Sequence, residues 1–238
     1  MQTVTLSLYR FDTLNAKLWA LAQMATARFA LRALPELGFF KLCGSGTGEG
    51  FTPIPNTAVY AILATWPDKA TAERVMAEAR VFRRYAAKAA EACTIFLTPQ
   101  SARGQWAGQS PFHGTDLPVA GPIAALTRAT IKPSIALRFW RHVPNISAVI
   151  GADPNVLFKI GIGELPWFQQ VTFSIWPDAT SMAAFARHDG PHARAIRAVR
   201  DGNWFQEELY ARFAVQSVAG TWEGRRLLSD TSMKVPAE

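Results

Sequence analysis

The amino-acid sequence predicts an α+β protein whose two halves share one fold and pack together as a barrel. Three observations support this prediction. The same order of strands and helices occurs twice along the chain, the tripeptide Trp-Pro-Asp ends a strand in each half (residues 66–68 and 176–178), and a tryptophan follows the last strand of each half (Trp106 and Trp222). A repeat this long indicates a duplicated domain and not a solenoid.

The first half begins with a strand, because Val4, Leu6 and Leu8 alternate with polar residues and therefore share one face. Apolar residues then recur at helical spacing from Leu14 to Leu34, where Pro35 ends the predicted helix. The remaining predicted elements are strands over Phe39–Cys43, Val59–Trp66 and Cys93–Leu97, and a helix over Thr71–Ala92.

A glycine-rich segment, residues 44–50, follows the second predicted strand. It lacks the Gly-Lys-Ser/Thr of a phosphate-binding loop, and the prolines at positions 53 and 55 prevent the helix that a dinucleotide site requires. We interpret the segment as a hairpin connection or a pocket wall, with a nucleotide site as the less favoured alternative.

The second half repeats the order of the first. Its predicted elements are strands over Ile123–Ile131, Val156–Ile162, Gln170–Trp176 and Leu209–Val218, a helix over Ala136–Ile150, and a helical region after residues 176–178. Residues 158–160 (Phe-Lys-Ile) are matched with residues 40–42 (Phe-Lys-Leu).

Strand-helix-strand-strand-helix-strand is the ferredoxin-like arrangement. Each repeat leaves one apolar sheet face that it cannot cover alone, so we expect the two sheets to pack face to face as an α+β barrel of the dimeric type. The predicted organisation is a first repeat over residues 1–109, a linker over 110–121, a second repeat over 122–224 and a polar tail over 225–238.

The composition limits the classes of partner. The formal net charge is +7 over 238 residues, but the basic residues are scattered and no nucleic-acid-binding motif is present, so nucleic acid is not an expected partner. An acidic protein, an anionic membrane surface or the carboxylates of a cofactor fit this charge better. Two cysteines, Cys43 and Cys93, are too few for a disulfide framework.

No signal peptide or transmembrane span is predicted, because Met1 to Phe11 has the pattern of a strand and arginines interrupt the most apolar N-terminal region. The expected location is the cytoplasm, with peripheral contact at the inner membrane as an open alternative.

His192 is the main candidate for chemistry. Alignment of the two Trp-Pro-Asp tripeptides places Phe82 opposite His192, so the fold accepts an apolar residue at this position. Pro191 precedes it in the first turn of a predicted helix, on a face otherwise formed by alanine, isoleucine and valine. An imidazole on an apolar face is typical of a haem axial ligand. The alternative is a core histidine bonded to a backbone carbonyl.

Other ligand sets are weaker. His188 lies four residues before His192, the spacing of a metal pair, but Gly190 and Pro191 interrupt the helix between them. Cys43 is an alternative as a thiolate ligand to haem, although the wider sequence context of cytochrome P450 ligands is missing. No Ser-His-Asp set or carboxylate pair supports hydrolysis.

A bound haem would need basic residues to meet its propionates. The candidates are Arg194, Arg197, Arg200, Arg128 and Lys159. The alternative for the three arginines that follow His192 is a solvated helix face.

Several longer motifs resemble those of a known family. They are Ser45-Gly46-Thr47-Gly48 with Gly50-Phe51-Thr52-Pro53, residues 122–130 (PIAALTRAT), residues 169–178 (QQVTFSIWPD) and residues 189–196 (DGPHARAI). Together they resemble the spheroidene monooxygenases, the acyclic carotenoid 2-ketolases, over about residues 1–222.

The resemblance implies a haem b-containing monooxygenase that uses O2 and reduced ferredoxin to introduce a keto group at C-2 of spheroidene-type carotenoids. Haem-degrading α+β barrels carry the axial histidine on the second helix of the ferredoxin-like unit, where His192 falls, and this is an analogy of fold. The net positive charge suits an acidic ferredoxin. The alternative function is a non-catalytic barrel that binds haem or a pigment.

Overall fold

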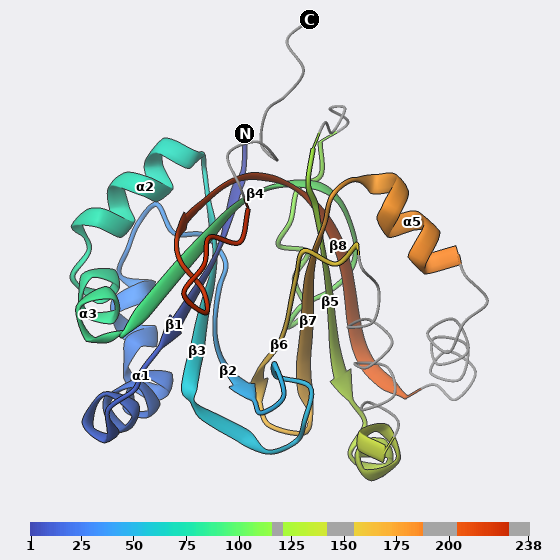
Figure 1. The fold of residues 1–238 in the computed structure, drawn as a ribbon, viewed down its shortest axis with the longest axis horizontal. Helices are drawn as coiled ribbons and strands as arrows, with labels where there is room; N and C mark the ends of the chain where they lie inside the picture. The colour runs from blue at the N-terminus through green and yellow to red at the C-terminus, as the bar shows by residue number, and fades with distance from the viewer. Residues whose placement is uncertain (116–120, 142–154, 188–203, 229–238) are drawn as a thin grey trace, which may run out of the picture.

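Eight strands close into one antiparallel barrel in the computed structural model, which describes residues 1–115, 121–141, 155–187 and 204–228 (Figure 1). Around the barrel the strands follow the order β1-β3-β2-β6-β7-β5-β8-β4, and β4 pairs with β1 to close the ring. The predicted α+β barrel is therefore confirmed.

The first half contributes four strands and three helices. They are β1 (Thr3–Arg10), α1 (Leu14–Arg32), β2 (Phe40–Gly46), β3 (Pro55–Trp66), α2 (Lys69–Glu78), α3 (Arg80–Lys88) and β4 (Glu91–Gly104). The single helix predicted over residues 71–92 is wrong, because Ala79 is extended (φ −68°, ψ 128°) and separates α2 from α3. The break redirects α3 so that Phe82 and Tyr85 are buried.

The second half contributes the other four strands. Its described elements are β5 (Ile123–Ile131), the 3₁₀ turn η1 (Pro133–Ile135) continued by helical residues 136–141, β6 (Phe158–Leu165), β7 (Gln169–Trp176), α5 (Ala179–Arg187) and β8 (Phe205–Gly220). The remainder of the helix predicted to end at Ile150 lies outside the described residues.

Equivalent strands meet at the two seams between the halves. Strand β2 pairs with β6, and β4 pairs with β8, as expected for two like units related by a two-fold axis. Strands β4 and β8 are longer than predicted, because the C-terminal part of β4 pairs with β8 as far as Leu209 and the N-terminal residues of β8 pair with the end of β5. The bounds of the two repeats, the linker and the tail stay predictions.

Strand register corrects one predicted match between the halves. Phe40 pairs with Ala64, and Lys159 pairs with Ser174, each two residues before the tryptophan of the Trp-Pro-Asp stop. Phe40 is therefore equivalent to Lys159, one residue away from the predicted match. Because side chains alternate along a strand, this offset places Lys41 inside the barrel and Lys159 on its outer face.

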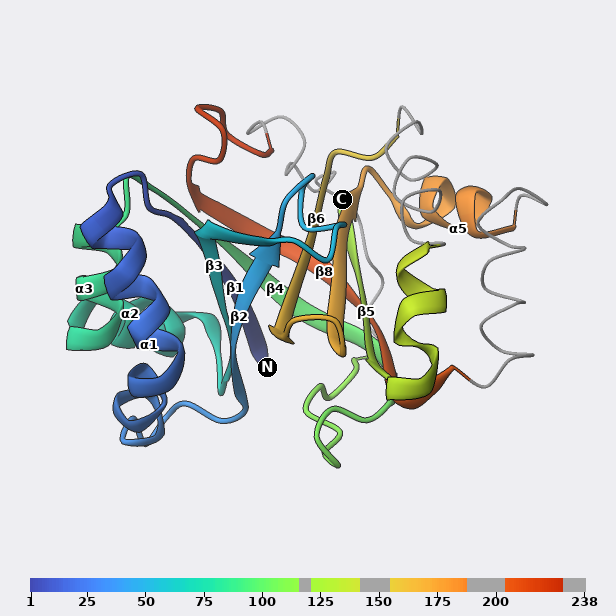
Figure 2. The same ribbon diagram turned by 90° about the horizontal axis from the view of Figure 1, so that it is seen from below.

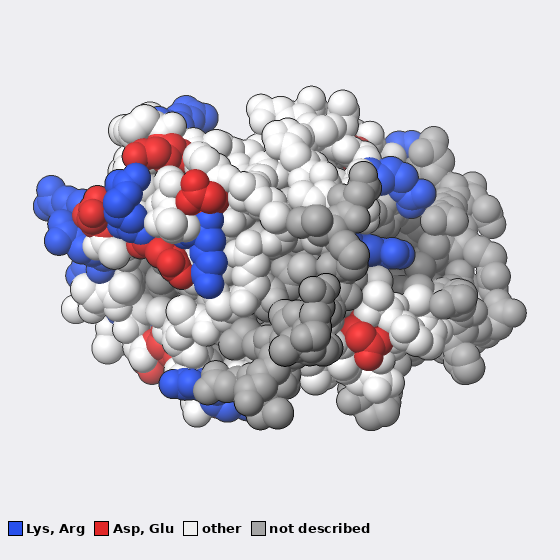
Figure 3. All heavy atoms as spheres, turned by 90° about the horizontal axis from the view of Figure 1, so that it is seen from above, with Lys and Arg blue, Asp and Glu red and all other residues white. Residues whose placement is uncertain are grey.

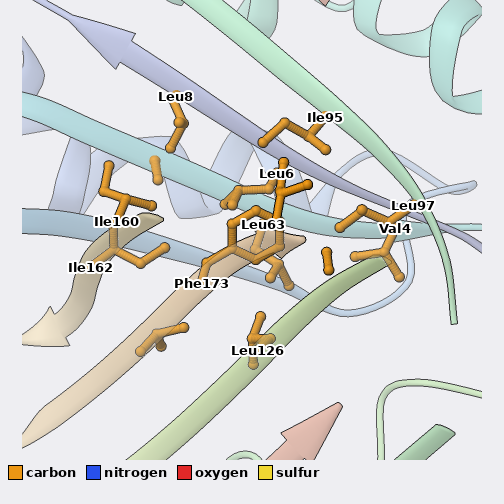
Figure 4. Close-up of a cluster of buried hydrophobic side chains, with 14 of the residues drawn as sticks. Val4, Leu6, Leu8, Leu63, Ile95, Leu97, Leu126, Ile160, Ile162 and Phe173 are labelled. Atoms are coloured by element: carbon orange, nitrogen blue, oxygen red, sulfur yellow. The ribbon is translucent and has the colours of Figure 1, made fainter. Parts of the chain in front are cut away.

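The barrel interior is a packed apolar core (Figure 4). Side chains from both halves, including Leu6, Leu63, Ile95 and Phe173, are fully buried there. This agrees with an eight-stranded barrel, whose interior is just wide enough for side chains to fill. The barrel is thus a scaffold, and any larger bound molecule must lie outside it.

A second apolar layer covers the outer face of the first half. Helices α1, α2 and α3 pack on the outer face of β1 and β3 through residues that include Tyr9, Phe11, Ile62 and Tyr85 (Figure 2).

Each half caps the helix after its Trp-Pro-Asp tripeptide in the same way. Asp68 Oδ1 accepts the N–H of Thr71 at 2.8 Å, and Asp178 Oδ1 accepts the N–H of Ser181 at 2.7 Å.

Candidate functional site

The outer face of the second half has smaller side chains than the equivalent face of the first half. Tyr9 of β1 and Ala129 of β5 occupy equivalent register positions, as do Ile62 of β3 and Thr172 of β7. In the first half the large side chains fill the space beneath the helices. In the second half the equivalent side chains are small, and we call this face the small-residue floor; Ala129 on it is 5% exposed.

Aromatic and apolar side chains border this floor on two sides. On the α5 side, the ring of Phe185 lies 5.0 Å from the ring of Trp176, next to the buried Met182. On the other side, Trp140 lies 5.5 Å from Phe139 and donates from Nε1 to the carbonyl of Trp167 at 3.1 Å. We refer to Phe51, Phe139, Trp140, Trp167 and Phe205 as the aromatic cluster.

A pocket of about 230 Å³ adjoins the aromatic cluster at the seam between the halves. Its walls come from α1, the β2–β3 connection, the β6–β7 turn and residue 140, and they include Leu21, Met24, Pro53, Trp140 and Trp167. The glycine-rich segment is therefore both a hairpin connection and a pocket wall, as predicted.

The glycines of this connection are required by close backbone contact. Gly50 has φ +89°, and a Cβ at this position would lie 1.7 Å from the carbonyl oxygen of Gly161 on β6. The N–H of Gly161 donates to the carbonyl of Glu49 at 2.8 Å, and Ser45 Oγ donates to the carbonyl of Gly161 at 2.8 Å. These contacts fix the pocket wall onto the second half.

Four of the predicted site residues, His192, Arg194, Arg197 and Arg200, lie outside the described residues, as does His188. The counterpart of His192 in the first half is described. Phe82 is 3% exposed, and its ring centre lies 5.9 Å from that of Trp66 at the end of β3. In the first half, this position of the repeat therefore faces the sheet.

The other two predicted cations lie on opposite sides of the sheet. Arg128 shares the inner face of β5 with Leu126, is 2% exposed and pairs with Glu207. Lys159 lies on the outer face, where its Nζ is 2.6 Å from Glu49 Oε2 and 5.3 Å from the centre of the Phe51 ring. The structure does not bring these two side chains together, and only Lys159 lies on the side of the small-residue floor.

Cys43 is fully buried in the barrel interior. Burial raises the pKa of its thiol above the ordinary value. A thiolate there is strongly disfavoured, and no room for haem adjoins it within the packed core. Its position in the packed core does not favour Cys43 as a haem ligand.

Two carboxylates inside one end of the barrel, Glu207 and Glu164, were not predicted from the sequence. Glu207 accepts the N–H groups of Ala107 and Gly108 at 3.0 and 2.7 Å and pairs with Arg128. Burial alone would raise the pKa of Glu207, but these two N–H groups and the guanidinium together hold that pKa below its usual value.

Beside that pair, Glu164 accepts from Trp106 Nε1 at 2.6 Å and from Lys41 Nζ at 2.7 Å. Trp106 is fully buried and closes this end of the barrel.

The opposite end is built in the same way. Glu91 accepts the N–H groups of Glu223 and Gly224 at 2.9 and 2.8 Å, next to Trp222. Its cation is Arg10, at 3.6 Å and 30% exposed. One sequence signal relates the glutamates at the two ends of the barrel. Glu91 precedes Trp106 by the same number of residues as Glu207 precedes Trp222.

Among the described residues, no group of three or more His, Cys, Asp or Glu side chains could hold a metal ion. The arrangement that remains is a small-residue floor with aromatic borders and an adjoining pocket. Apolar contact of this kind selects a large hydrophobic molecule or a flat macrocycle and not a polar metabolite.

Solved structures with a similar arrangement include aldoxime dehydratase. One such structure has a TM-score of 0.60 at 11% identity, covering 90% of this chain and 81% of that chain. Another, in complex with butyraldoxime, has a TM-score of 0.55 at 10% identity, covering 90% and 79%. At these identities the likeness shows the fold alone.

No protein-family model matches the chain. Sequence relatives include the spheroidene monooxygenase of Cereibacter sphaeroides, 51% identical over 100% of this chain and 74% of that protein. The spheroidene monooxygenase of Rhodobacter capsulatus is 50% identical over 94% of this chain and 95% of that protein, and that of Rubrivivax gelatinosus is 36% identical over 89% and 81%. The chain therefore belongs to the spheroidene monooxygenase family of enzymes.

Proposed function

We propose that this chain is a haem-dependent monooxygenase that introduces a keto group at C-2 of acyclic, spheroidene-type carotenoids, using O2 and reduced ferredoxin. The observation that carries the proposal is 50–51% identity over 94–100% of the chain to two proteins named spheroidene monooxygenase. The name supports the carotenoid substrate and O2. The haem, the electron donor and the position of oxidation rest on the motif resemblance.

The small side chains of the second-half floor support haem binding on this side of the sheet. Ala129 and Thr172 stand where Tyr9 and Ile62 fill the equivalent space of the first half, so a flat macrocycle can take the place of those side chains. The repeat equates His192 with Phe82, which faces its sheet, and this supports His192 as the residue that would hold the iron.

The propionates are expected to meet basic residues on the same side of the sheet. Lys159 and the three arginines Arg194, Arg197 and Arg200 are the candidates we retain, because Arg128 lies on the inner face of the barrel, away from the floor. When bound, haem supplies the centre at which O2 is activated, and the protein controls access and position.

A carotenoid chain end offers few hydrogen-bonding groups, so shape and apolar contact must position it. Trp140 and Trp167 belong both to the aromatic cluster and to the adjoining pocket, so one apolar wall serves both. This wall excludes water and orients the chain end. The closed backbone contact at Gly50 keeps the wall rigid.

The electron donor and the location are proposals from charge. A formal net charge of +7 favours docking of an acidic ferredoxin, with a rate that falls as salt rises. No helix among the described residues is long and apolar enough to cross a membrane. We propose a cytoplasmic protein with peripheral contact at the inner membrane.

The decisive variant is His192→Ala. We expect it to lose the haem Soret band and the conversion of spheroidene, while the exposed control His113→Ala and the neighbour His188→Ala keep both. Absorption spectra before and after dithionite measure the first property, and chromatography of the carotenoid products measures the second. A folded His192→Ala protein with a normal haem spectrum would contradict the ligand assignment.

The same purified protein separates an enzyme from a carrier. Oxygen-dependent formation of a ketocarotenoid with reduced ferredoxin supports the proposal. Haem or pigment binding without turnover under those conditions would favour the non-catalytic alternative.

A further inference from the structure

Large exposed apolar side chains gather on one side of the molecule. Eight of the ten large hydrophobic residues that are exposed among the described residues lie on α1, on residues 47–54, on residues 133–141 or on the β6–β7 turn, residues 165–168. They are Leu14, Leu18, Leu21, Phe29, Ile54, Leu137, Leu165 and Trp167. These four segments lie along the lower edge of Figure 1 and face the viewer of Figure 2, and we call them the docking face.

Helix α1 exposes the apolar residues that such a helix would normally bury. Leu14 is 71% exposed, Leu18 57% and Leu21 54%, whereas the buried positions of the helix hold Ala20, Ala27 and Leu31. A helix of a soluble protein places its leucines toward the core. An exposed stripe of this length marks an interaction surface.

The β6–β7 turn gives an independent indication. Pro166 and Trp167 occupy the central positions of a turn closed by the Phe168 N–H and the Leu165 carbonyl, and Trp167 has φ +74°. That conformation favours glycine, and any other residue there costs about 1–2 kcal/mol. Trp167 packs against Trp140, with 6.4 Å between the ring centres, yet 38% of the residue stays exposed on the docking face.

The charge of the docking face selects its partner. Its basic residues are Lys17, Arg28, Arg32, Arg138 and Arg141, and its one acidic residue, Glu49, pairs with Lys159 at 2.6 Å. Its formal charge is therefore 5 − 1 = +4. On the opposite side, α2 pairs its basic side chains with acidic ones, as in Lys69–Glu73 and Arg74–Glu78 (Figure 3).

We propose that the docking face is a membrane-binding surface that inserts its apolar side chains into an anionic bilayer and opens the 230 Å³ pocket toward the lipid. Apolar side chains combined with basic ones, without unpaired acids, are the composition of helices that lie in the bilayer interface. The choice of a bilayer over a protein partner rests on the proposed carotenoid substrate, which would be dissolved in lipid. Leu21 and Trp167 line the pocket, so a lipid-dissolved chain would enter without crossing water.

Vesicle sedimentation tests the proposal on the full-length protein. We expect binding to vesicles of equal parts phosphatidylglycerol and phosphatidylcholine, and weaker binding to pure phosphatidylcholine by about fivefold for each basic residue that reaches the surface. Leu18→Glu with Leu21→Glu should reduce binding by about 100-fold, because each leucine loses the transfer energy of its side chain. The matched control is Ala77→Glu with Ala87→Glu, which adds the same charge to exposed positions of α2 and α3.

Trp167→Gly separates docking from folding. Glycine relieves the strain at φ +74° and so offsets the lost contact with Trp140; the free energy of unfolding should change little while vesicle binding falls about tenfold. A purely structural tryptophan would lower stability on removal and leave vesicle binding unchanged, which would overturn the proposal.

The remaining outcomes are equally distinct. Wild-type protein that ignores anionic vesicles would overturn the proposal, and so would a Leu18→Glu, Leu21→Glu variant that only converts a dimer to a monomer in size-exclusion chromatography. Conversion of detergent-dispersed carotenoid tests the proposed function without a bilayer. Failure there, with vesicle binding intact, would refute the function and not the docking face.

Discussion

Replacing Glu207 by glutamine should expose the cost of a buried, uncompensated charge. Arg128 is 2% exposed and points into the barrel, and Glu207 is the carboxylate that neutralises it. Glu207→Gln keeps the shape of the side chain and one acceptor for the N–H groups of Ala107 and Gly108, but it removes the charge. The guanidinium then remains inside the barrel without a counter-charge.

The expected magnitude follows from the burial of the two partners. Removing one member of a buried ion pair costs about 3–5 kcal/mol. The side chain of Glu207 is 23% exposed, so water can partly replace it, and we expect the lower limit, about 3 kcal/mol. For a chain of this size, that loss corresponds to a fall in Tm of about 6–12 °C.

Glu91→Gln is the matched control because Glu91 makes the same backbone contacts at the other end of the barrel. Its cation, Arg10, is 30% exposed, so the loss of the pair should cost about 1 kcal/mol or less. Urea unfolding followed by tryptophan fluorescence measures both variants. Equal destabilisation would refute the reasoning, as would failure of Arg128→Met to recover stability in the Glu207→Gln background.

The other predictions concern acid stability, the pocket wall and the floor. Because the pKa of Glu207 is held below its usual value, its contribution to stability is present above about pH 4.3 and is lost as the pH falls further. Glu207→Gln should therefore lose less stability than the wild type between neutral pH and acid, and parallel urea titrations at several pH values check this. Gly50→Ala should cost about 3 kcal/mol or more, whereas Gly108→Ala, also at positive φ but with open space around its Cβ, should cost about 1 kcal/mol; similar losses would contradict the clash. Ala129→Tyr, which introduces the residue found at the equivalent Tyr9, should lower haem uptake, as measured by the absorption spectrum of the folded protein; normal haem uptake would show that the floor is not the cofactor site.

The fold was predictable because both halves carry a clear sequence signal where a strand ends. Trp-Pro-Asp marks the end of a strand and the start of a capped helix, and the aspartate of each copy accepts the expected N–H. Strand β5 coincides with its predicted bounds. The break at Ala79 was not predictable, because alanine favours helix and neither proline nor glycine lies there.

The candidate site was predictable only in part. The Gly50 connection could be recognised as a pocket wall because alternating glycines signal close backbone contact. The inward direction of Arg128 could not be predicted, because its partner Glu207 lies 79 residues away and no sequence pattern indicates that the two residues meet. The docking face could not be predicted either. A helical period shows that α1 has an apolar stripe, but it does not show whether that stripe faces the core or the solvent.

The closure of both seams within one polypeptide has a consequence for how such a barrel can change. In a homodimer every substitution appears twice, so a cavity opened on one sheet would also remove the supporting layer from the other. Here the β2–β6 and β4–β8 seams join two halves that mutate independently. The first half can keep Tyr9, Tyr60 and Tyr85 as a stable core. The second half can then accept smaller side chains without loss of that core.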